Sequence, residues 1–229
     1  MSTLAIIPAR GGSKGIPGKN LVDVAGRPLI AWSIAQGIEA DMVDRVLVTT
    51  DSEEIARVAH KWGAETPFLR PAELAVDTAT TESAIFHALD WLQVNEGYAP
   101  ERVILLQPTC PVRKKSSIDK AIRLLIDTGA DSLVGVREIH PFLWRAPDDA
   151  KAEYDYLKRP RRQDIEAADR IYEETGSLYL ARTATMRQTG NRLGGRVILF
   201  QMESSEGIDI DTPDDVVVAS AIIGALYLS

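Results

Sequence analysis

The sequence has 229 residues, of which 45% are hydrophobic and 26% are charged, the composition of an ordinary globular protein. Its net charge of −7 argues against a general nucleic-acid-binding surface, and no apolar stretch approaches the roughly 18–20 residues of a membrane helix. The single cysteine, Cys110, excludes an internal disulfide framework and suits a reducing compartment, so we expect a cytoplasmic protein without nucleic-acid or membrane partners.

The chain opens with a short apolar run, Leu4 to Ile7, that predicts a buried strand and leads into a glycine-rich loop ending at Asn20. Glycines lack a Cβ, so the backbone N–H groups of this loop can approach an anion closely. Three cations lie in the same loop: Arg10, Lys14 and Lys19. This combination favours binding of a polyphosphate, such as that of a nucleotide, over the alternative of a flexible loop with solvated charges. The loop matches neither the Walker A motif nor the G-x-G-x-x-G motif.

Apolar runs alternate with segments of helical period through the rest of the chain, which predicts βαβ units on a mainly parallel sheet. We expect further strands at 46–50, 103–107, 132–136, 176–181 and 197–201. We expect helices at 29–40, 51–61, 80–91, 116–126 and 216–226. Asp51 is the expected cap of the second helix, since Glu54 follows three residues later. The last helix is mostly apolar and is expected to be well buried, with Thr212 as its N-cap and Pro213 at its first position.

Residues 141–172 carry charge, proline and scattered aromatic residues without a clear period. A structureless loop of that length is unusual inside a compact domain. We therefore expect one domain that spans residues 1–229, with an insertion at about 141–172 that packs on a partner subunit.

A second informative stretch, Glu206 to Asp211, places two carboxylates two residues apart. As a strand, it would direct Asp209 and Asp211 to one face, while the neighbouring isoleucines point to the core. A pair of carboxylates suits Mg²⁺, which usually takes one or two of them and completes its shell with phosphate and water. The alternative is that Asp211 belongs to the cap of the following helix and that Asp209 is simply exposed.

The first loop reads I-P-A-R-G-G-S-K-G-I-P-G-K-N, which resembles the signature of the acylneuraminate cytidylyltransferases, also called CMP-sialic acid synthetases. Four later stretches add to the resemblance: R-P-A-E-L-A and D-T-A at 70–79, L-Q-P-T-C-P at 106–111, R-P-R-R-Q-D at 159–164 and D-I-D at 209–211. The resemblance implies a three-layer, Rossmann-like α/β nucleotidyltransferase fold and a homodimer. It also implies that CTP and an acidic nine-carbon keto sugar react to give the CMP-sugar and pyrophosphate, with Mg²⁺ as cofactor.

The resemblance also implies roles for individual residues. The residues implied in catalysis are Arg10, Lys14, Lys19, Asp209 and Asp211, and the two aspartates are implied to bind Mg²⁺. The residues implied in nucleotide binding are Ala9, Arg10, Gly11, Gly12, Asn20, Arg70, Thr80 and Thr81. The residues implied in sugar binding are Gln107, Arg162, Gln163 and Tyr179. An arginine suits the sugar because it can give a carboxylate two parallel hydrogen bonds.

Several departures from the family pattern lie on the sugar side. Thr175 replaces an asparagine, the lysine expected after His140 and Pro141 is missing, and an aromatic pair is replaced by Arg192 and Leu193. The sugar itself is therefore left open between neuraminic, legionaminic, pseudaminic and deaminated acids and Kdo. Cys110 stands where serine is common in the family, and we interpret it as a small buried residue rather than a nucleophile.

Three alternative functions remain open at this stage. A Kdo-type cytidylyltransferase would carry out the same chemistry on another keto-acid sugar. A glycosyltransferase would use Asp209 and Asp211 as a D-x-D site for a nucleotide sugar and would release no pyrophosphate. A non-catalytic module would bind CTP and leave it unchanged.

Overall fold

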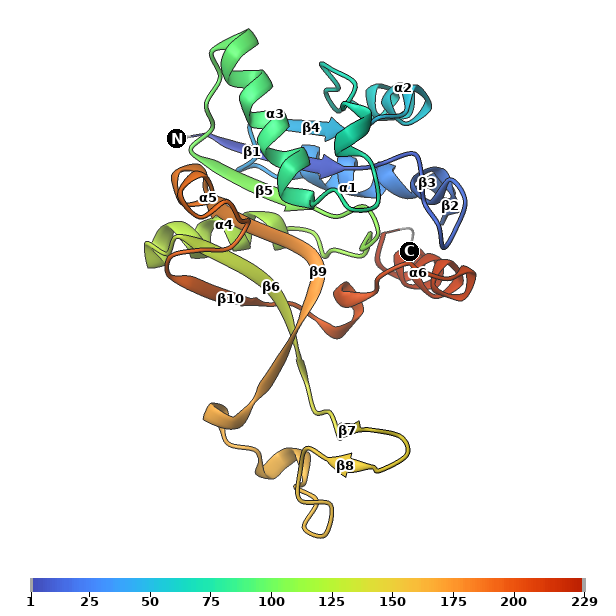
Figure 1. Cartoon of the computed structure of the whole chain (residues 1–229), viewed down its shortest axis with the longest axis vertical. Helices are drawn as coiled ribbons and strands as arrows, with labels where there is room; N and C mark the ends of the chain where they lie inside the picture. The colour runs from blue at the N-terminus through green and yellow to red at the C-terminus, as the bar shows by residue number, and fades with distance from the viewer. Residues whose placement is uncertain (1, 228–229) are drawn as a thin grey trace.

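The computed structural model describes residues 2–227 and shows a six-stranded sheet with helices on both faces (Figure 1). The strands are β1 (Thr3–Pro8), β4 (Arg45–Thr49), β5 (Arg102–Leu106), β6 (Ser132–Ile139), β9 (Ile171–Arg182) and β10 (Val197–Gln201). Their order in the sheet is β10–β6–β9–β5–β1–β4. β1 pairs in parallel with β4 and β5, and β6 pairs in parallel with β10, whereas β9 lies antiparallel between β5 and β6. The mainly parallel sheet expected from the sequence is confirmed, with one antiparallel strand.

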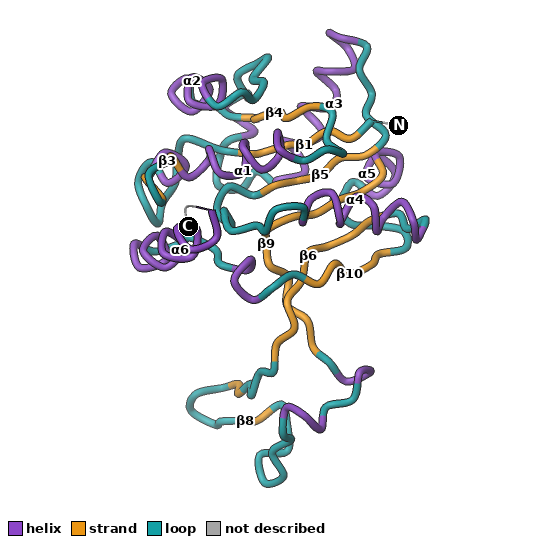
Figure 2. Tube along the Cα trace, turned by 180° about the vertical axis from the view of Figure 1, so that it is seen from behind, coloured by secondary structure: helices purple, strands orange, loops and turns teal. Residues whose placement is uncertain are grey.

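Helices cover both faces of the sheet and so complete three layers (Figures 1 and 2). α1 (Leu29–Glu39), α2 (Glu53–Lys61) and α4 (Ser117–Thr128) pack on one face, and α3 (Thr81–Glu96) and α5 (Thr183–Thr189) pack on the other. In α4 the buried stripe has helical spacing and consists of Ile118, Ala121, Ile122 and Leu125. Burial of each large apolar side chain contributes about 1.5–3 kcal/mol relative to exposure, so these stripes hold the helices to the sheet. The expected three-layer α/β fold is confirmed.

The last helix, α6 (Pro213–Tyr227), packs against the start of α1 and a small hairpin of β2 (Asp23–Val24) and β3 (Arg27–Pro28). Thr212 caps α6 as expected, since its hydroxyl accepts from Asp215 N at 3.4 Å and its own N–H donates to Asp215 Oδ2 at 2.7 Å. Val217 is 69% exposed, so the expectation that α6 is well buried is wrong. The reason is that α6 covers the side of the molecule rather than a face of the sheet. None of the helices in residues 2–227, α6 included, is long and apolar enough to cross a membrane.

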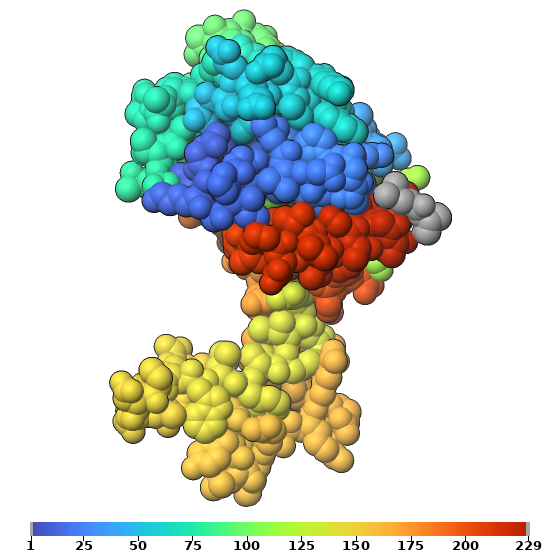
Figure 3. Space-filling model, turned by 90° about the vertical axis from the view of Figure 1, so that its right-hand side faces the viewer, coloured from blue at the N-terminus to red at the C-terminus, as the bar shows by residue number. Residues whose placement is uncertain are grey.

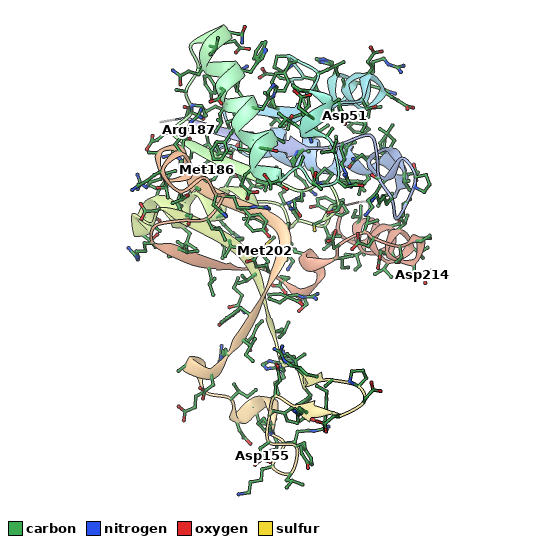
Figure 4. The ribbon with its side chains drawn as sticks, in the orientation of Figure 1. Asp51, Asp155, Met186, Arg187, Met202 and Asp214 are labelled. Atoms are coloured by element: carbon green, nitrogen blue, oxygen red, sulfur yellow. The ribbon has the colours of Figure 1, made fainter. Side chains whose placement is uncertain are left out.

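The start of α2 differs from the expectation by one residue. Ser52, not Asp51, is the N-cap, and its hydroxyl accepts a hydrogen bond from Ile55 N at 3.4 Å. Asp51, labelled in Figure 4, lies two residues after the end of β4 and accepts a hydrogen bond from Gly11 N at 2.9 Å. The predicted cap is wrong because the first loop engages Asp51, and the spacing of nearby residues cannot reveal such a long-range contact.

Beyond the sheet, β6 and β9 continue as a pair and carry an arm that projects from the body (Figures 1 and 3). The arm holds a hairpin of β7 (Trp144–Arg145) and β8 (Lys151–Ala152), followed by the 3-10 turns η3 (Arg162–Asp164) and η4 (Ala167–Asp169). The insertion expected from the sequence is thus a distinct arm with short regular elements. It exposes several large apolar side chains: Phe142, Leu143, Trp144, Tyr156 and Leu157.

Candidate active site

A cavity of about 500 Å³ opens at the carboxyl ends of β1 and β5, beside the start of α3. Ligands of open α/β sheets bind at this edge, outside the carboxyl ends of the strands. Its walls come from the loop after β1, the segment from 70 to 84, the end of β5 and the residue two before α6. The predicted site residues that line it are Arg10, Lys14, Lys19, Asn20, Arg70, Thr80, Thr81, Gln107 and Asp211.

The first loop and the segment before α6 are far apart in the sequence but adjacent at this cavity, as the blue and red surfaces of Figure 3 show. Lys19 Nζ donates to Ile210 O at 2.7 Å and pairs with Asp211 Oδ1 at 2.9 Å. Gly15 permits the close approach, because a Cβ at this position would lie 2.9 Å from the Asp211 carbonyl oxygen. The cationic loop and the acidic stretch that the sequence predicts to act together therefore meet.

The two aspartates do not lie on a strand, because η5 (Ser204–Gly207) precedes them and residues 208–211 are irregular. The predicted strand is wrong, since Ile210 N donates to Thr109 O at 2.8 Å, outside the sheet. Ile210 is nevertheless buried while Asp209 and Asp211 are exposed, so the expected alternation of side chains is present. Asp211 lines the cavity, whereas Asp209 does not and lies near Cys110.

Cys110 is fully buried, and its thiol donates a hydrogen bond to Thr175 O at 3.3 Å. Burial raises the pKa of Cys110 to about 12, and the negative charge of Asp209 acts in the same direction. A thiol with such a pKa stays protonated at neutral pH and cannot act as a nucleophile. The structure therefore agrees with the interpretation of Cys110 as a small buried residue.

Three residues expected to bind the nucleotide belong to the first loop and its entry but do not line the cavity. Ala9 is fully buried. Gly11 N donates to Asp51, and Gly12 is exposed, with nothing within 4 Å of the place where a Cβ would lie. The loop therefore presents its charged side chains to the cavity rather than the backbone of these three residues.

Arg70 ties the wall of the cavity to the end of β4. Its side chain is almost completely buried, its Nε donates to Thr49 Oγ1 at 3.1 Å, and its backbone N donates to Thr50 O at 2.7 Å. Burial lowers the pKa of Arg70, and the nearby carboxylate of Asp51 opposes this effect. These contacts make Arg70 a fixed cation at the edge of the cavity.

Asn20 and Thr80 line the cavity while they stabilise the backbone around it. Asn20 Nδ2 donates to Arg10 O at 3.0 Å, which holds the start of the first loop. Thr80 is the N-cap of α3, because its hydroxyl accepts from Ser83 N at 3.1 Å. Both side chains are therefore held in place by hydrogen bonds within the protein.

Asp77 also lines the cavity, although it is not among the residues for which the sequence predicts a role. Its carboxylate pairs with Arg10 Nη1 at 2.7 Å and with Lys14 Nζ. Hydrogen bonds from Lys14 and then from Arg10 lower the pKa of Asp77. The only signal in the sequence is its place in the D-T-A stretch, and this does not reveal a partner 67 residues away.

Arg113 is a second residue that sequence reasoning missed. It is fully buried, and its guanidinium donates to Gln107 O, Ser33 Oγ and Gln36 Oε1, each at 2.9 Å. It also donates to Ser177 O on β9. Burial lowers the pKa of Arg113 to about 10. The basic run Arg113-Lys114-Lys115 suggests solvated charges, yet Arg113 fixes the end of β5 that carries Gln107 into the cavity.

Tyr179, which is expected to bind the sugar, lies on β9 next to β5 in the sheet and does not line the cavity. Its hydroxyl donates to Glu174 Oε2 at 2.7 Å, and burial together with this contact raises the pKa of Tyr179. The guanidinium of Arg192 lies 5.0 Å from the centre of the Tyr179 ring, and its Nε donates to Glu82 Oε1 at 2.6 Å. Tyr179, Glu174, Arg192 and Glu82 thus form a chain of linked side chains.

Arg162 and Gln163 lie on η3 of the arm and do not line the cavity of their own chain. Arg162 lines a separate cavity of about 560 Å³ within the arm, together with Phe142, Tyr154 and Arg159. Asp155, labelled in Figure 4, marks how far this part of the arm lies from the body. The structure therefore does not bring the two predicted arm residues together with the rest of the site.

Comparison with known proteins decides the family. A family model described as "Cytidylyltransferase" matches residues 4–190. The chain belongs to the cytidylyltransferase family. This confirms the family and the reaction class, CTP-dependent nucleotidyl transfer, that the sequence predicts.

Two relatives and one solved structure resemble this cytidylyltransferase. The CMP-N,N'-diacetyllegionaminic acid synthase of Legionella pneumophila is 36% identical over 94% of this chain and 93% of that protein. The N-acylneuraminate cytidylyltransferase of Streptococcus agalactiae is 31% identical over 99% of this chain and 54% of that protein. A CMP:2-keto-3-deoxy-manno-octonic acid synthetase complexed with CTP superposes with a TM-score of 0.70 over 98% of this chain and 99% of that chain. At 17% identity, this last match supports the fold alone.

We expect Gly15→Ala to lower kcat/KM for CTP about tenfold or more, because the added Cβ would push the first loop away from Asp211. Steady-state pyrophosphate release measures the effect, and thermal denaturation checks that the variant is folded. Gly224→Ala on α6 is the matched control, since its Cβ meets open space and should leave the rate nearly unchanged. Equal rates in the two variants would contradict the importance of the close approach.

Proposed function

We propose that this cytidylyltransferase transfers CMP from CTP to the anomeric hydroxyl of a nonulosonic acid and releases pyrophosphate. The observation that carries the proposal is the shared cavity in which Arg10, Lys14 and Lys19 face Asp211. Three cations from one loop are opposite in charge to a triphosphate and would attract it. The names of the two relatives, which describe synthesis of CMP-legionaminic acid and cytidylyl transfer to N-acylneuraminate, support the sugar class.

The reaction needs little covalent chemistry from the protein. The hydroxyl oxygen of the sugar attacks the α-phosphorus, the bond to the oxygen that bridges the α- and β-phosphorus breaks, and pyrophosphate leaves with the negative charge. The hydroxyl proton passes to solvent. In phosphoryl-type transfer, positioning and charge stabilisation supply most of the catalysis, so the loop cations are the principal catalytic groups. Arg70, Asn20 and Thr80 then border the space for the nucleoside.

Asp209 and Asp211 are the residues that would hold Mg²⁺. Both are exposed, and their carboxylate oxygens are the hard ligands that Mg²⁺ prefers. Within residues 2–227 no group of three or more His, Cys, Asp or Glu side chains is suited to a metal, so phosphate and water would have to supply the other ligands. When bound, the ion would neutralise phosphate charge and lower the pKa of the attacking hydroxyl.

We also propose a homodimer, because the arm exposes apolar surface and carries two predicted sugar ligands. Leu157 is 81% exposed and Trp144 is 50% exposed, which is typical of surface that another subunit covers. Arg162 and Gln163 lie outside their own cavity, so a contact with the sugar requires the cavity of the second copy. A cytoplasmic location is the corresponding proposal for a chain with one buried thiol.

The purified protein, offered CTP and Mg²⁺ with a panel of keto-acid sugars, is expected to form a CMP-nonulosonic acid and pyrophosphate. The panel contains neuraminic, legionaminic, pseudaminic and deaminated acids and Kdo, and mass spectrometry identifies each product. A product with Kdo alone would establish the Kdo-type alternative. Consumption of a nucleotide sugar without pyrophosphate release would indicate a glycosyltransferase, and CTP that is bound but unchanged would indicate a binding module.

We expect Arg10→Ala and Asp211→Asn each to reduce kcat/KM about a hundredfold, because one charge contact in such a site contributes roughly 3 kcal/mol to the transition state. Pyrophosphate release with the preferred sugar gives the rates. Asp214→Asn is the control, since Asp214 is an exposed carboxylate in the first turn of α6 (Figure 4). Wild-type rates for both site variants would rule out this assignment of catalytic residues.

Leu157→Glu is expected to convert the dimer to a monomer, because it places a charge on the apolar surface of the arm. Analytical ultracentrifugation measures the mass in solution. Val94→Glu on α3 is the matched control, since Val94 is also 81% exposed but lies on the body. A wild-type protein that sediments as a monomer would overturn the proposed dimer.

A further inference from the structure

Asp77 holds two of the three cations that the first loop brings to the cavity. Arg10 Nη1 lies 2.7 Å from Asp77 Oδ1, and Lys14 Nζ pairs with the other carboxylate oxygen. Arg10 and Lys14 belong to the loop after β1, whereas Asp77 belongs to the segment between η2 (Ala72–Leu74) and α3. All three side chains line the cavity. A carboxylate from one wall therefore offsets part of the positive charge of the other wall, where phosphates would bind.

The pairing of Asp77 is open to exchange with another anion. Its side chain is 47% exposed, and that of Lys14 is 78% exposed. Within residues 2–227, the carboxylate hydrogen-bonds only to these two cations. The pKa of Asp77 is lowered by the same two contacts, so the group stays charged at neutral pH. Exposed ion pairs of this kind are weak and exchange readily.

The pairing of Lys19 with Asp211 is different in kind. The Lys19 side chain is only 11% exposed, and its ammonium also donates to Ile210 O at 2.7 Å. A second, backbone acceptor and the low exposure fix Lys19 in place. The loop therefore carries one anchored cation and two cations held by a carboxylate that can leave.

We propose that Asp77 is an internal counter-ion that competes with phosphate groups for Arg10 and Lys14, and so sets how tightly the site holds CTP and pyrophosphate. The inference rests on the proposed function only for the identity of the polyphosphate. Entry of a triphosphate exchanges two carboxylate contacts for phosphate contacts, so part of the attraction is offset. After the transfer, return of Asp77 to the same cations favours departure of pyrophosphate.

The test compares Asp77→Asn with the wild type by isothermal titration calorimetry, with pyrophosphate as the probe and without Mg²⁺ so that only the cation contacts are measured. The amide keeps the shape of the side chain and removes its charge. We expect the Kd for pyrophosphate to fall about three- to tenfold, as the loss of two exposed ion pairs suggests. With active enzyme, the inhibition constant of pyrophosphate should fall by the same factor.

Two further variants separate a specific contact from a general change of charge. Glu73→Gln removes one negative charge from η2, four residues away, at an exposed carboxylate, and should change the Kd less than about twofold. Asp77→Glu restores a competing carboxylate and should return the Kd toward the wild-type value. Thermal denaturation in the absence of pyrophosphate confirms that each variant is folded.

The outcomes are distinct for the two proposals. If Asp77→Asn binds pyrophosphate as weakly as the wild type, or more weakly, Asp77 is no competitor and the inference is overturned. The same follows if Glu73→Gln tightens binding equally. A wild type that binds pyrophosphate but neither binds nor turns over CTP would overturn the proposed function alone, and the ratio of the two pyrophosphate Kd values would still decide the role of Asp77.

Discussion

The contact between Lys19 and the backbone and side chain of residues 210–211 is the constraint on which the cavity depends. Lys19 follows the first strand, and Asp211 comes just before the last helix, so one ammonium group joins the two ends of the chain. The Lys19 side chain is 11% exposed and that of Asp211 is 72% exposed, so the hydrogen bond to Ile210 O is the better shielded of the two contacts. Gly15 has no side chain, and this lets the two segments touch. The loop, the acidic stretch and α6 are positioned together by this one closure.

Much of the fold was predictable because its central strands are apolar throughout. The runs Leu4–Ile7 and Val103–Leu106 are buried on both faces, as their composition indicates. The errors have a common physical cause, since each involves a segment whose partner is distant in sequence. Asp51 serves the first loop instead of its own helix, and α6 packs on the side of α1 where half of it faces solvent. The pattern of hydrophobic residues indicates that a segment is buried, and it does not indicate which other segment it packs against.

The site was predictable where a short motif carries the chemistry. The cationic loop and the D-I-D stretch can be recognised from their residue types. The structure places Arg10 and Asp211 at one cavity. Asp77 and Arg113 could not be found in this way, because their importance lies in partners 67 and 80 residues away. The roles of Arg162 and Gln163 stay predictions, since they depend on how a second chain packs and a single sequence contains no geometry between subunits.

The buried thiol of Cys110 can report on local opening of the protein beside the candidate active site. It is the only sulfhydryl in the chain, it lies where the end of β5 meets β9 and Asp209, and it is protonated and inaccessible while that junction is closed. Alkylation by a thiol reagent therefore requires opening of the junction, and the modification rate relative to that of an exposed thiol gives the local free energy of opening. The dynamics of the catalytic edge are accessible in the unmodified protein, without an introduced label.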